Sequence, residues 1–271
     1  MYPHTAIACL ARSAFVALLG LLVLAGAVAC GTGPSPAPAV PTGLVLVDPP
    51  APSSSADNAP QKPASAVHHA AEELDPSLAT KKAPETFSAH FTTTKGDFVI
   101  EVHRAWAPNG ADRFNNLVAL GFYDDTRFFR AISGFMVQFG IPAEPAVAGK
   151  WVEAHIQDDS PKQSNRRGFV TFAQTGMPNS RTTQIFINYG DNSQLDAANF
   201  TPFGRVVTGM NVVDSLYSGY GEGAPNGNGP AQGRVQNEGN TYLDQDFPKL
   251  DRILSVTLIT PVPTRTVPEP R

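Results

Sequence analysis

Short segments in which apolar and polar residues alternate recur through the second half of the chain, and they predict a mainly β protein. In one of them Phe98, Ile100 and Val102 alternate with more polar neighbours, so that one face of the strand is apolar. Lys95-Gly96 separates the first two segments in the manner of a hairpin turn. We expect eight strands, at residues 87–94, 97–103, 127–132, 134–139, 168–173, 184–188, 202–207 and 252–259.

Two segments have helical patterns instead. Phe114, Leu117 and Val118 fall at helical spacing after Pro108, and a second, shorter helix is expected at residues 210–217. Many short strands with two helices favour a closed antiparallel barrel whose ends the helices cap, although the pattern alone also allows a sandwich. Residues 218–247 are rich in Gly and Asn and form a long connection, either a surface loop without function or a border of a substrate cleft.

The chain begins with the pattern of a secretory signal. Arg12 precedes an apolar run at residues 14–29, which is too short for a comfortable membrane span, and small residues lead to Cys30. Residues 27–31 resemble a bacterial lipobox, which predicts lipidation of Cys30 and anchoring to a membrane. The alternative is an unpaired thiol near the cleavage site. In both cases we expect an exported protein whose mature chain has no internal disulfide, because Cys9 lies within the signal.

Composition then divides the rest of the chain. Residues 30–85 are rich in Pro, Ala and Ser and predict a disordered tether, while residues 261–271 form a Pro-rich tail. Between them, residues 86–260 are about 175 residues, enough for one domain. His68-His69 lacks other ligands at regular spacing, so a solvated pair is favoured over a metal site.

Charge excludes one class of partner. The formal net charge is −4, and no basic stripe with interleaved aromatic residues is present, so nucleic acid is not an expected partner. Nothing in the sequence indicates an obligate oligomer, and a monomer is the default expectation.

Arg130 stands in an aromatic and otherwise uncharged run, residues 128–140. This run, together with Phe172-Ala173-Gln174 and the later segment of residues 184–187, resembles the signature of the cyclophilins, the peptidyl-prolyl cis/trans isomerases. The resemblance extends from about residue 87 to residue 259 and implies a closed eight-stranded antiparallel barrel capped by two α-helices.

The resemblance implies a reaction without a nucleophile, metal or cofactor. A planar peptide resists rotation by about 18 to 20 kcal/mol, and uncatalysed exchange at X-Pro takes tens to hundreds of seconds. A site accelerates the exchange when it binds the twisted amide better than either planar isomer. By resemblance, the Arg130 guanidinium supplies a fixed donor to the prolyl nitrogen, which regains its lone pair as the amide twists.

The same resemblance assigns the other site residues. Phe135, Met136, Phe186 and Leu195 match the apolar pocket for the proline ring, although Leu195 is equally compatible with a place in the core. Gln138 and Gln184 match the two glutamines of the family, and Ala173 and Gln174 match the pair whose backbone aligns the peptide.

Several positions depart from the family pattern. Histidine is replaced by Phe129 and aspartate by Ile141, and Phe139 and Ser133 replace glycine and proline, so the segment around Arg130 is more apolar. Gln194 stands where many members have tryptophan, which argues against cyclosporin-type ligands. The channel histidine has no direct counterpart, and either Asn199 or Phe200 takes its place.

We therefore expect an exported prolyl isomerase that assists the folding of proline-containing proteins of the cell envelope. Two other hypotheses remain open: a non-catalytic, chaperone-like module that binds proline peptides, and a passive structural lipoprotein. The last leaves the isolated Arg130 unexplained, and fold alone does not decide among them.

Overall fold

The computed structural model describes residues 74–259. The chain divides into two compact units, residues 1–59 and 60–271, and all described residues belong to the second. The expected signal peptide, Cys30, His68-His69 and the Pro-rich tail lie outside the described residues.

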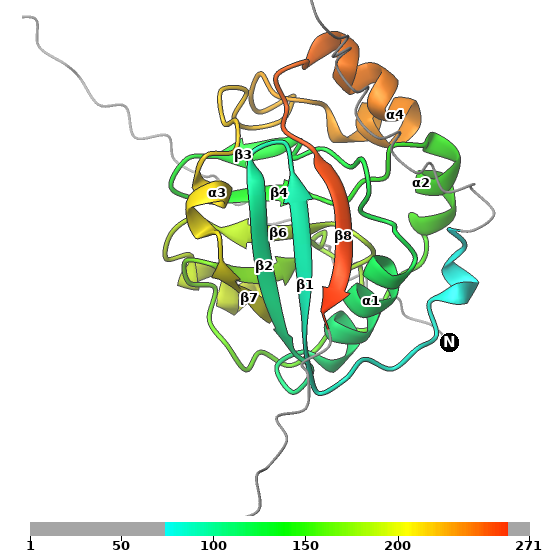
Figure 1. Cartoon of the computed structure of the whole chain (residues 1–271), viewed down its shortest axis with the longest axis vertical. Helices are drawn as coiled ribbons and strands as arrows, with labels where there is room; N and C mark the ends of the chain where they lie inside the picture. The colour runs from blue at the N-terminus through cyan, green and yellow to red at the C-terminus, as the bar shows by residue number, and fades with distance from the viewer. Residues whose placement is uncertain (1–73, 260–271) are drawn as a thin grey trace, which may run out of the picture. The chain divides into compact units, whose positions relative to one another are not determined.

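Eight antiparallel strands form one sheet, and they agree with the eight segments expected from the pattern. The order across the sheet is β3-β4-β6-β5-β7-β2-β1-β8, and Figure 1 shows β2, β1 and β8 in front of the others. The strands are β1 (Thr86–Thr93), β2 (Gly96–His103), β3 (Arg130–Ile132), β4 (Met136–Phe139), β5 (Phe169–Phe172), β6 (Ile185–Asn188), β7 (Pro202–Thr208) and β8 (Ile253–Ile259).

The sheet is an open half-barrel, so the expectation of a closed barrel was wrong. β3 and β8 end the sheet, and no ladder joins them. Their neighbouring segments touch through an isolated bridge between Arg127 and Arg252 and through the Phe128 amide, which donates to the Asp251 carbonyl at 3.0 Å. β3 has only three residues, and all of them pair with β4.

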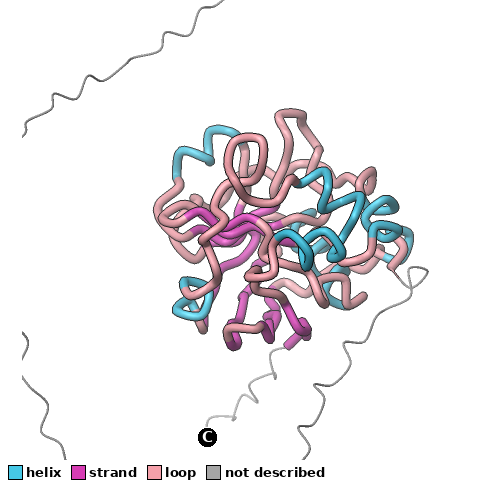
Figure 2. Tube along the Cα trace, turned by 90° about the horizontal axis from the view of Figure 1, so that it is seen from above, coloured by secondary structure: helices cyan, strands magenta, loops and turns pink. Residues whose placement is uncertain are grey.

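Aromatic side chains fill the concave side of the sheet. Phe91, Phe98 and Phe114 are fully buried, and the rings of Phe91 and Phe98 stack with centroids 4.7 Å apart. Figure 2 shows one group of strands crossing the middle of the domain and another at its lower edge, with most of the helices to the sides. The apolar residues of the alternating pattern therefore face the core and the polar residues face outward. In β2, for example, every second residue from Phe98 onward is buried.

Four α-helices accompany the sheet, where two were expected. α1 (Pro108–Ala119) matches the prediction, and α3 (Met210–Asp214) is a shorter form of the second predicted helix. α2 (Pro145–Trp151) and α4 (Gln232–Asp246) were not predicted. α2 has only seven residues, too few to show a clear helical period. α4 is rich in Gly and Asn, which are weak helix formers, so its sequence resembles a loop. Its buried residues are Val235, Gly239, Tyr242 and Leu243.

α4 lies beside α2 and covers a second apolar cluster (Figure 1). Val235, Tyr242 and Leu243 of α4 pack there against Phe129 and Ile141. Gly239 allows this approach, because its φ is +60° and a Cβ at this position would collide with the Ala143 carbonyl oxygen.

Residues 74–85, which the sequence assigned to the tether, pack on the domain. Leu74 and Ala83 are buried, and residues 76–78 form a 3₁₀ helix. The Trp151 indole donates to the Leu74 carbonyl at 2.7 Å, and the Ala83 amide donates to Asp112 at 2.8 Å. This attachment depends on backbone groups, which composition does not reveal.

No helix within residues 74–259 has both the length and the apolar character needed to cross a bilayer. In the same residues, no cluster of three or more His, Cys, Asp or Glu side chains could hold a metal ion.

Candidate functional site

Arg130 and Gln138 lie directly opposite each other in the pairing of β3 with β4. Residues opposite each other in an antiparallel pair place their side chains on the same face. Ile132 and Met136 form the next pair with the same orientation, so these two pairs share one face of the sheet.

The Arg130 guanidinium is held from two sides. Its Nη1 donates to Gln138 Oε1 at 3.0 Å and lies 4.0 Å from the Met136 sulfur. Nε and Nη2 donate to the two carboxylate oxygens of Glu222, each at 2.6 Å. Such two-point contacts between guanidinium and carboxylate define both distance and orientation.

Glutamines continue this chain of contacts along the site. Gln138 Nε2 donates to Gln184 Oε1 at 2.9 Å, and the Gln184 carbonyl accepts the Ala173 amide at 2.9 Å. Gln138 is buried whereas Gln184 is half-buried. The hydrogen-bonded series Arg130, Gln138 and Gln184 therefore leads from the contact with Glu222 to an open cavity, which both glutamines line.

This cavity has a volume of about 350 Å³. Four predicted residues contribute to its lining, as do two residues of α4: Gln138, Ala173, Gln174, Gln184, Gln232 and Gln236. Amides donate and accept hydrogen bonds without charge, which suits an uncharged peptide backbone. Gln232 and Gln236 of the 218–247 connection thus border this cavity.

The apolar candidates lie next to this cavity and do not line it. Phe186 faces Gln138 in the pairing of β4 with β6, and both Phe186 and Met136 are buried. The Phe200 ring meets the Phe186 ring edge to face, with centroids 5.8 Å apart. Asn199 is exposed at the end of a 3₁₀ helix, so of the two alternatives for the channel position it is Phe200 that contacts Phe186.

The remaining two apolar candidates, Phe135 and Leu195, are fixed by hydrogen bonds of their backbone groups. Phe135 lies in the turn before β4 and is half-buried, and its carbonyl accepts the Tyr189 amide at 2.8 Å and Asn192 Nδ2 at 2.7 Å. Leu195 is half-buried in the 3₁₀ helix Ser193–Ala198, where its amide donates to the Asn192 carbonyl at 2.9 Å.

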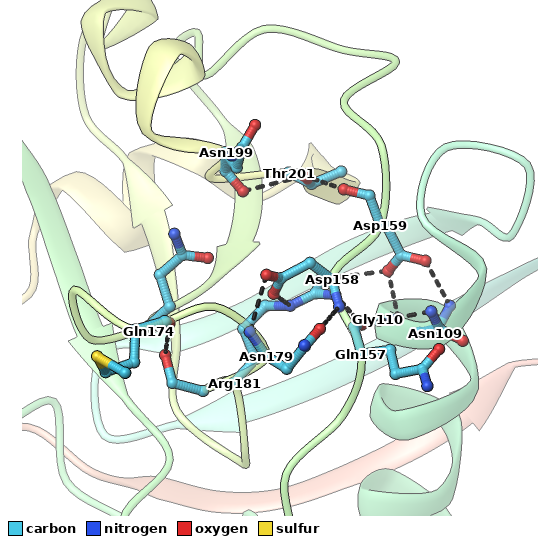
Figure 3. A network of polar contacts seen from close by, with 12 residues as sticks. Asn109, Gly110, Gln157, Asp158, Asp159, Gln174, Asn179, Arg181, Asn199 and Thr201 are labelled. Atoms are coloured by element: carbon cyan, nitrogen blue, oxygen red, sulfur yellow. Dashed lines mark hydrogen bonds and ion pairs between the residues drawn. The ribbon is translucent and has the colours of Figure 1, made fainter.

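A polar network supports the loop on the far side of the cavity (Figure 3). Gln174 Nε2 donates to the Ala198 carbonyl at 2.7 Å. Arg181 contacts Asp159 at 3.2 Å and Asp158 at 3.3 Å, and Asp159 accepts the amides of Asn109 and Gly110 at 2.9 Å each. The network therefore joins the loop between Gln174 and Arg181 to the first turn of α1.

The charges of the site are balanced. The Arg130 guanidinium, followed by a hydrogen bond from the Gly223 amide, holds the pKa of the Glu222 carboxyl below its usual range. Glu222 is therefore ionised at neutral pH, and the pair presents no net charge to a ligand.

Comparisons with known proteins agree with this geometry. The family model described as cyclophilin type peptidyl-prolyl cis-trans isomerase/CLD matches residues 88–236, more than half of the chain. The chain belongs to this family. The match ends within α4, so the remainder of this helix and β8 lie beyond it.

Individual relatives are bacterial and eukaryotic isomerases. The chain is 34% identical over 177 residues to peptidyl-prolyl cis-trans isomerase B of Escherichia coli, covering 62% of this chain and 97% of the relative. It is 37% identical over 129 residues to an isomerase of Acinetobacter baylyi, covering 46% of this chain and 68% of the relative. A solved cyclophilin-type isomerase of Cryptosporidium parvum gives a TM-score of 0.49 at 23% identity, covering 65% of this chain and 98% of that one.

The departures from the cyclophilin pattern now have a structural cause. Phe129 and Ile141 are buried beneath α4, where a histidine or aspartate would lose its hydration. Phe139 is buried in the main core instead. Phe129 and Ile141 therefore form part of the apolar surface against which α4 packs.

Glu222, Gln232 and Gln236 are the site residues that the sequence did not reveal. All three lie in residues 218–247, and Glu222 is separated from Arg130 by 92 positions. The one available signal was the length of this connection.

Proposed function

We propose that the protein is a peptidyl-prolyl cis/trans isomerase in which Arg130 stabilises the twisted prolyl amide. The observation that carries this proposal is the orientation of the Arg130 guanidinium by Gln138 and Glu222, beside Met136 and a glutamine-lined cavity. Proline-containing polypeptides are the substrates that this site suits.

The chemistry follows from the amide itself. Rotation about the X-Pro bond removes amide resonance and restores a lone pair to the prolyl nitrogen, so a donor placed there stabilises the twisted state more than the planar one. A donor that is already oriented does not have to reorganise during the reaction, and one such donor commonly contributes about 10²- to 10³-fold in rate.

Exchange spectroscopy by nuclear magnetic resonance on an Ala-Pro peptide tests this role, with the full chain in mild detergent. We expect Arg130→Ala to lower the catalysed exchange rate about 10²- to 10³-fold. The matched control is Arg205→Ala. Arg205 also lies on a strand and pairs with a glutamate, Glu101, at 3.1 Å, whereas Arg130 in addition donates to Gln138, which lines the cavity.

Arg130→Ala with the activity of the parent would reject the role of Arg130. Peptide binding without faster exchange in the parent would instead support the non-catalytic, chaperone-like module.

The proposal extends to location. An apolar run that ends in small residues before Cys30 supports an exported, lipid-anchored isomerase that assists folding of other cell-envelope proteins as a monomer. Metabolic labelling with a fatty acid is expected to mark the parent and not Cys30→Ala, which should leave the membrane fraction. Equal labelling of both, or none of either, would contradict the anchor without bearing on catalysis.

A further inference from the structure

Glu222 occupies one whole edge of the Arg130 guanidinium. A guanidinium has five N–H groups, of which Glu222 receives two and Gln138 one. Nε therefore has no N–H left, and Nη2 keeps one. The second N–H of Nη1 makes a long contact of 4.0 Å to the Met136 sulfur. A thioether is a weak acceptor, so a substrate can replace it, and both of these N–H groups lie away from the edge that Glu222 occupies.

The carboxylate is itself held in place. Glu222 Oε1 also accepts the Gly223 amide at 2.8 Å, and the Glu222 carbonyl accepts the Gly229 amide at 2.8 Å. Gly227 and Gly229 permit this folding of the chain, since a Cβ at either would meet the Glu222 carbonyl oxygen at 2.3 or 2.8 Å.

The segment that carries Glu222 is attached at both ends. Before it, the Tyr217 amide donates to Asp251 at 2.7 Å, and the Tyr220 ring meets the Phe247 ring with centroids 5.0 Å apart. After it, the Ala231 amide donates to the Tyr242 hydroxyl at 3.1 Å. Tyr242 belongs to the cluster over Phe129 and Ile141, so α4 connects the residues around Arg130 to the position of Glu222.

We propose that Glu222 is a positioning residue that aligns the Arg130 guanidinium, so that the free N–H of Nη2 and the N–H of Nη1 that contacts only the Met136 sulfur are presented to the prolyl amide. An arginine side chain has several rotatable bonds, and a two-point contact with Glu222 and a third with Gln138 restrict it to one orientation. The side chains of Arg130 and Glu222 are 27% and 35% exposed, so the pair borders solvent and a peptide can reach it. This inference rests on the role of Arg130 proposed above.

The test compares Glu222→Ala and Glu222→Gln with the parent in the same exchange assay, at saturating and at low peptide. We expect kcat to fall about ten- to hundred-fold in Glu222→Ala, since small misplacements of a catalytic group have effects of this size. KM should change less than about two-fold, because the cavity that holds the peptide is unaltered. Glu222→Gln retains one acceptor oxygen and should have an intermediate kcat.

Glu238→Gln is the matched control. Glu238 also accepts from Nε and Nη2 of an arginine, Arg234, at 2.7 and 2.8 Å, and it lies in the same 218–247 segment without lining the cavity. We expect its kcat and KM to equal those of the parent.

A double-mutant cycle separates positioning from a general effect on the fold. In the Arg130→Ala background, Glu222→Ala should cause no further loss of kcat, because the group that it aligns is absent. An additional loss in this background, or a kcat of Glu222→Ala equal to or above that of the parent, would overturn the positioning role.

The failures of the two proposals are distinguishable. A fully active Arg130→Ala rejects the role of Arg130 and with it the need for alignment. An inactive Arg130→Ala beside a fully active Glu222→Ala leaves the role of Arg130 intact and rejects Glu222 alone.

Discussion

Arg130 and Arg181 both pair with carboxylates, but one pair borders solvent and the other is enclosed. The Arg181 side chain is 1% exposed and its partner Asp159 is 3% exposed, compared with 27% for Arg130 and 35% for Glu222. Arg181 joins two elements of the framework, since Asp159 also accepts the first amides of α1 (Figure 3). Arg130 keeps one N–H of Nη2 without a partner among the described residues, and its partner Gln138 lines the cavity. The same kind of ion pair therefore supports the fold in one place and a ligand site in the other.

The largest effect that we expect is on stability, from Arg181→Met. This change leaves Asp159 buried without its cation, and breaking a buried pair in this way commonly costs about 3 to 5 kcal/mol. Arg130→Met should cost about 1 kcal/mol or less, because its partner can be hydrated. Urea unfolding of both variants measures the contrast, and equal losses of unfolding free energy would remove the distinction between the two arginines.

The second effect concerns activity, for which we expect a change at Arg130 to have a large effect although it has little effect on stability. Arg130→Lys keeps the charge but loses the planar fork that engages Glu222 and Gln138 together. We expect the exchange rate to fall about 10²-fold, with unfolding free energy within about 1 kcal/mol of the parent. Arg205→Lys, measured in the same assay, should retain full activity. A fully active Arg130→Lys would show that charge alone is sufficient.

The third effect tests the support that α4 gives to the open site. Val235 is buried against the cluster that contains Phe129 and Ile141. Val235→Ala removes two carbon atoms from this contact and should lower the unfolding free energy by about 2 kcal/mol. Hydrogen exchange should accelerate in residues 218–247 and not in α1, because local opening follows local packing. Uniform acceleration throughout the domain would mean that α4 does not open separately.

Within the site around Arg130, some residues could be predicted from the sequence and others could not. Arg130, Gln138 and Gln184 were predictable together because they match the motifs of the cyclophilin family, and the structure joins them by hydrogen bonds. Glu222 and α4 were not, because their segment resembles a loop in composition and meets Arg130 only through tertiary folding.

The closure of the barrel and the start of the domain were missed for a different reason. Local pattern predicts that a strand exists near Arg130, but not which strands pair, and β3 pairs with β4 alone. Leu74 joins the domain through its carbonyl, which Trp151 binds, and no side-chain pattern records such a contact.

The smallest effect that we expect is a dependence of stability on pH at Asp196, beside Leu195. Burial alone would raise the pKa of this carboxyl, but hydrogen bonds from the Ser164 hydroxyl and from the Asn165 amide and side chain outweigh it and hold the pKa below its usual range. A group whose pKa is lower in the folded state contributes stability above its unfolded pKa, and this contribution is lost as pH falls through the folded pKa.

Asp196→Asn removes this titration and keeps a side chain of similar size. At pH 7 the variant should be less stable than the parent by about 1 kcal/mol, since the ionised form accepts the stronger hydrogen bonds. The difference should shrink as pH falls below about 4, where the parent carboxyl begins to take up its proton. Urea unfolding at pH 7 and at several values below 4 measures both. A difference in unfolding free energy that stays constant with pH would contradict this. It would mean that the charge of Asp196 does not stabilise the 3₁₀ helix that carries Leu195, and that the Asp196 oxygen atoms act only as neutral acceptors.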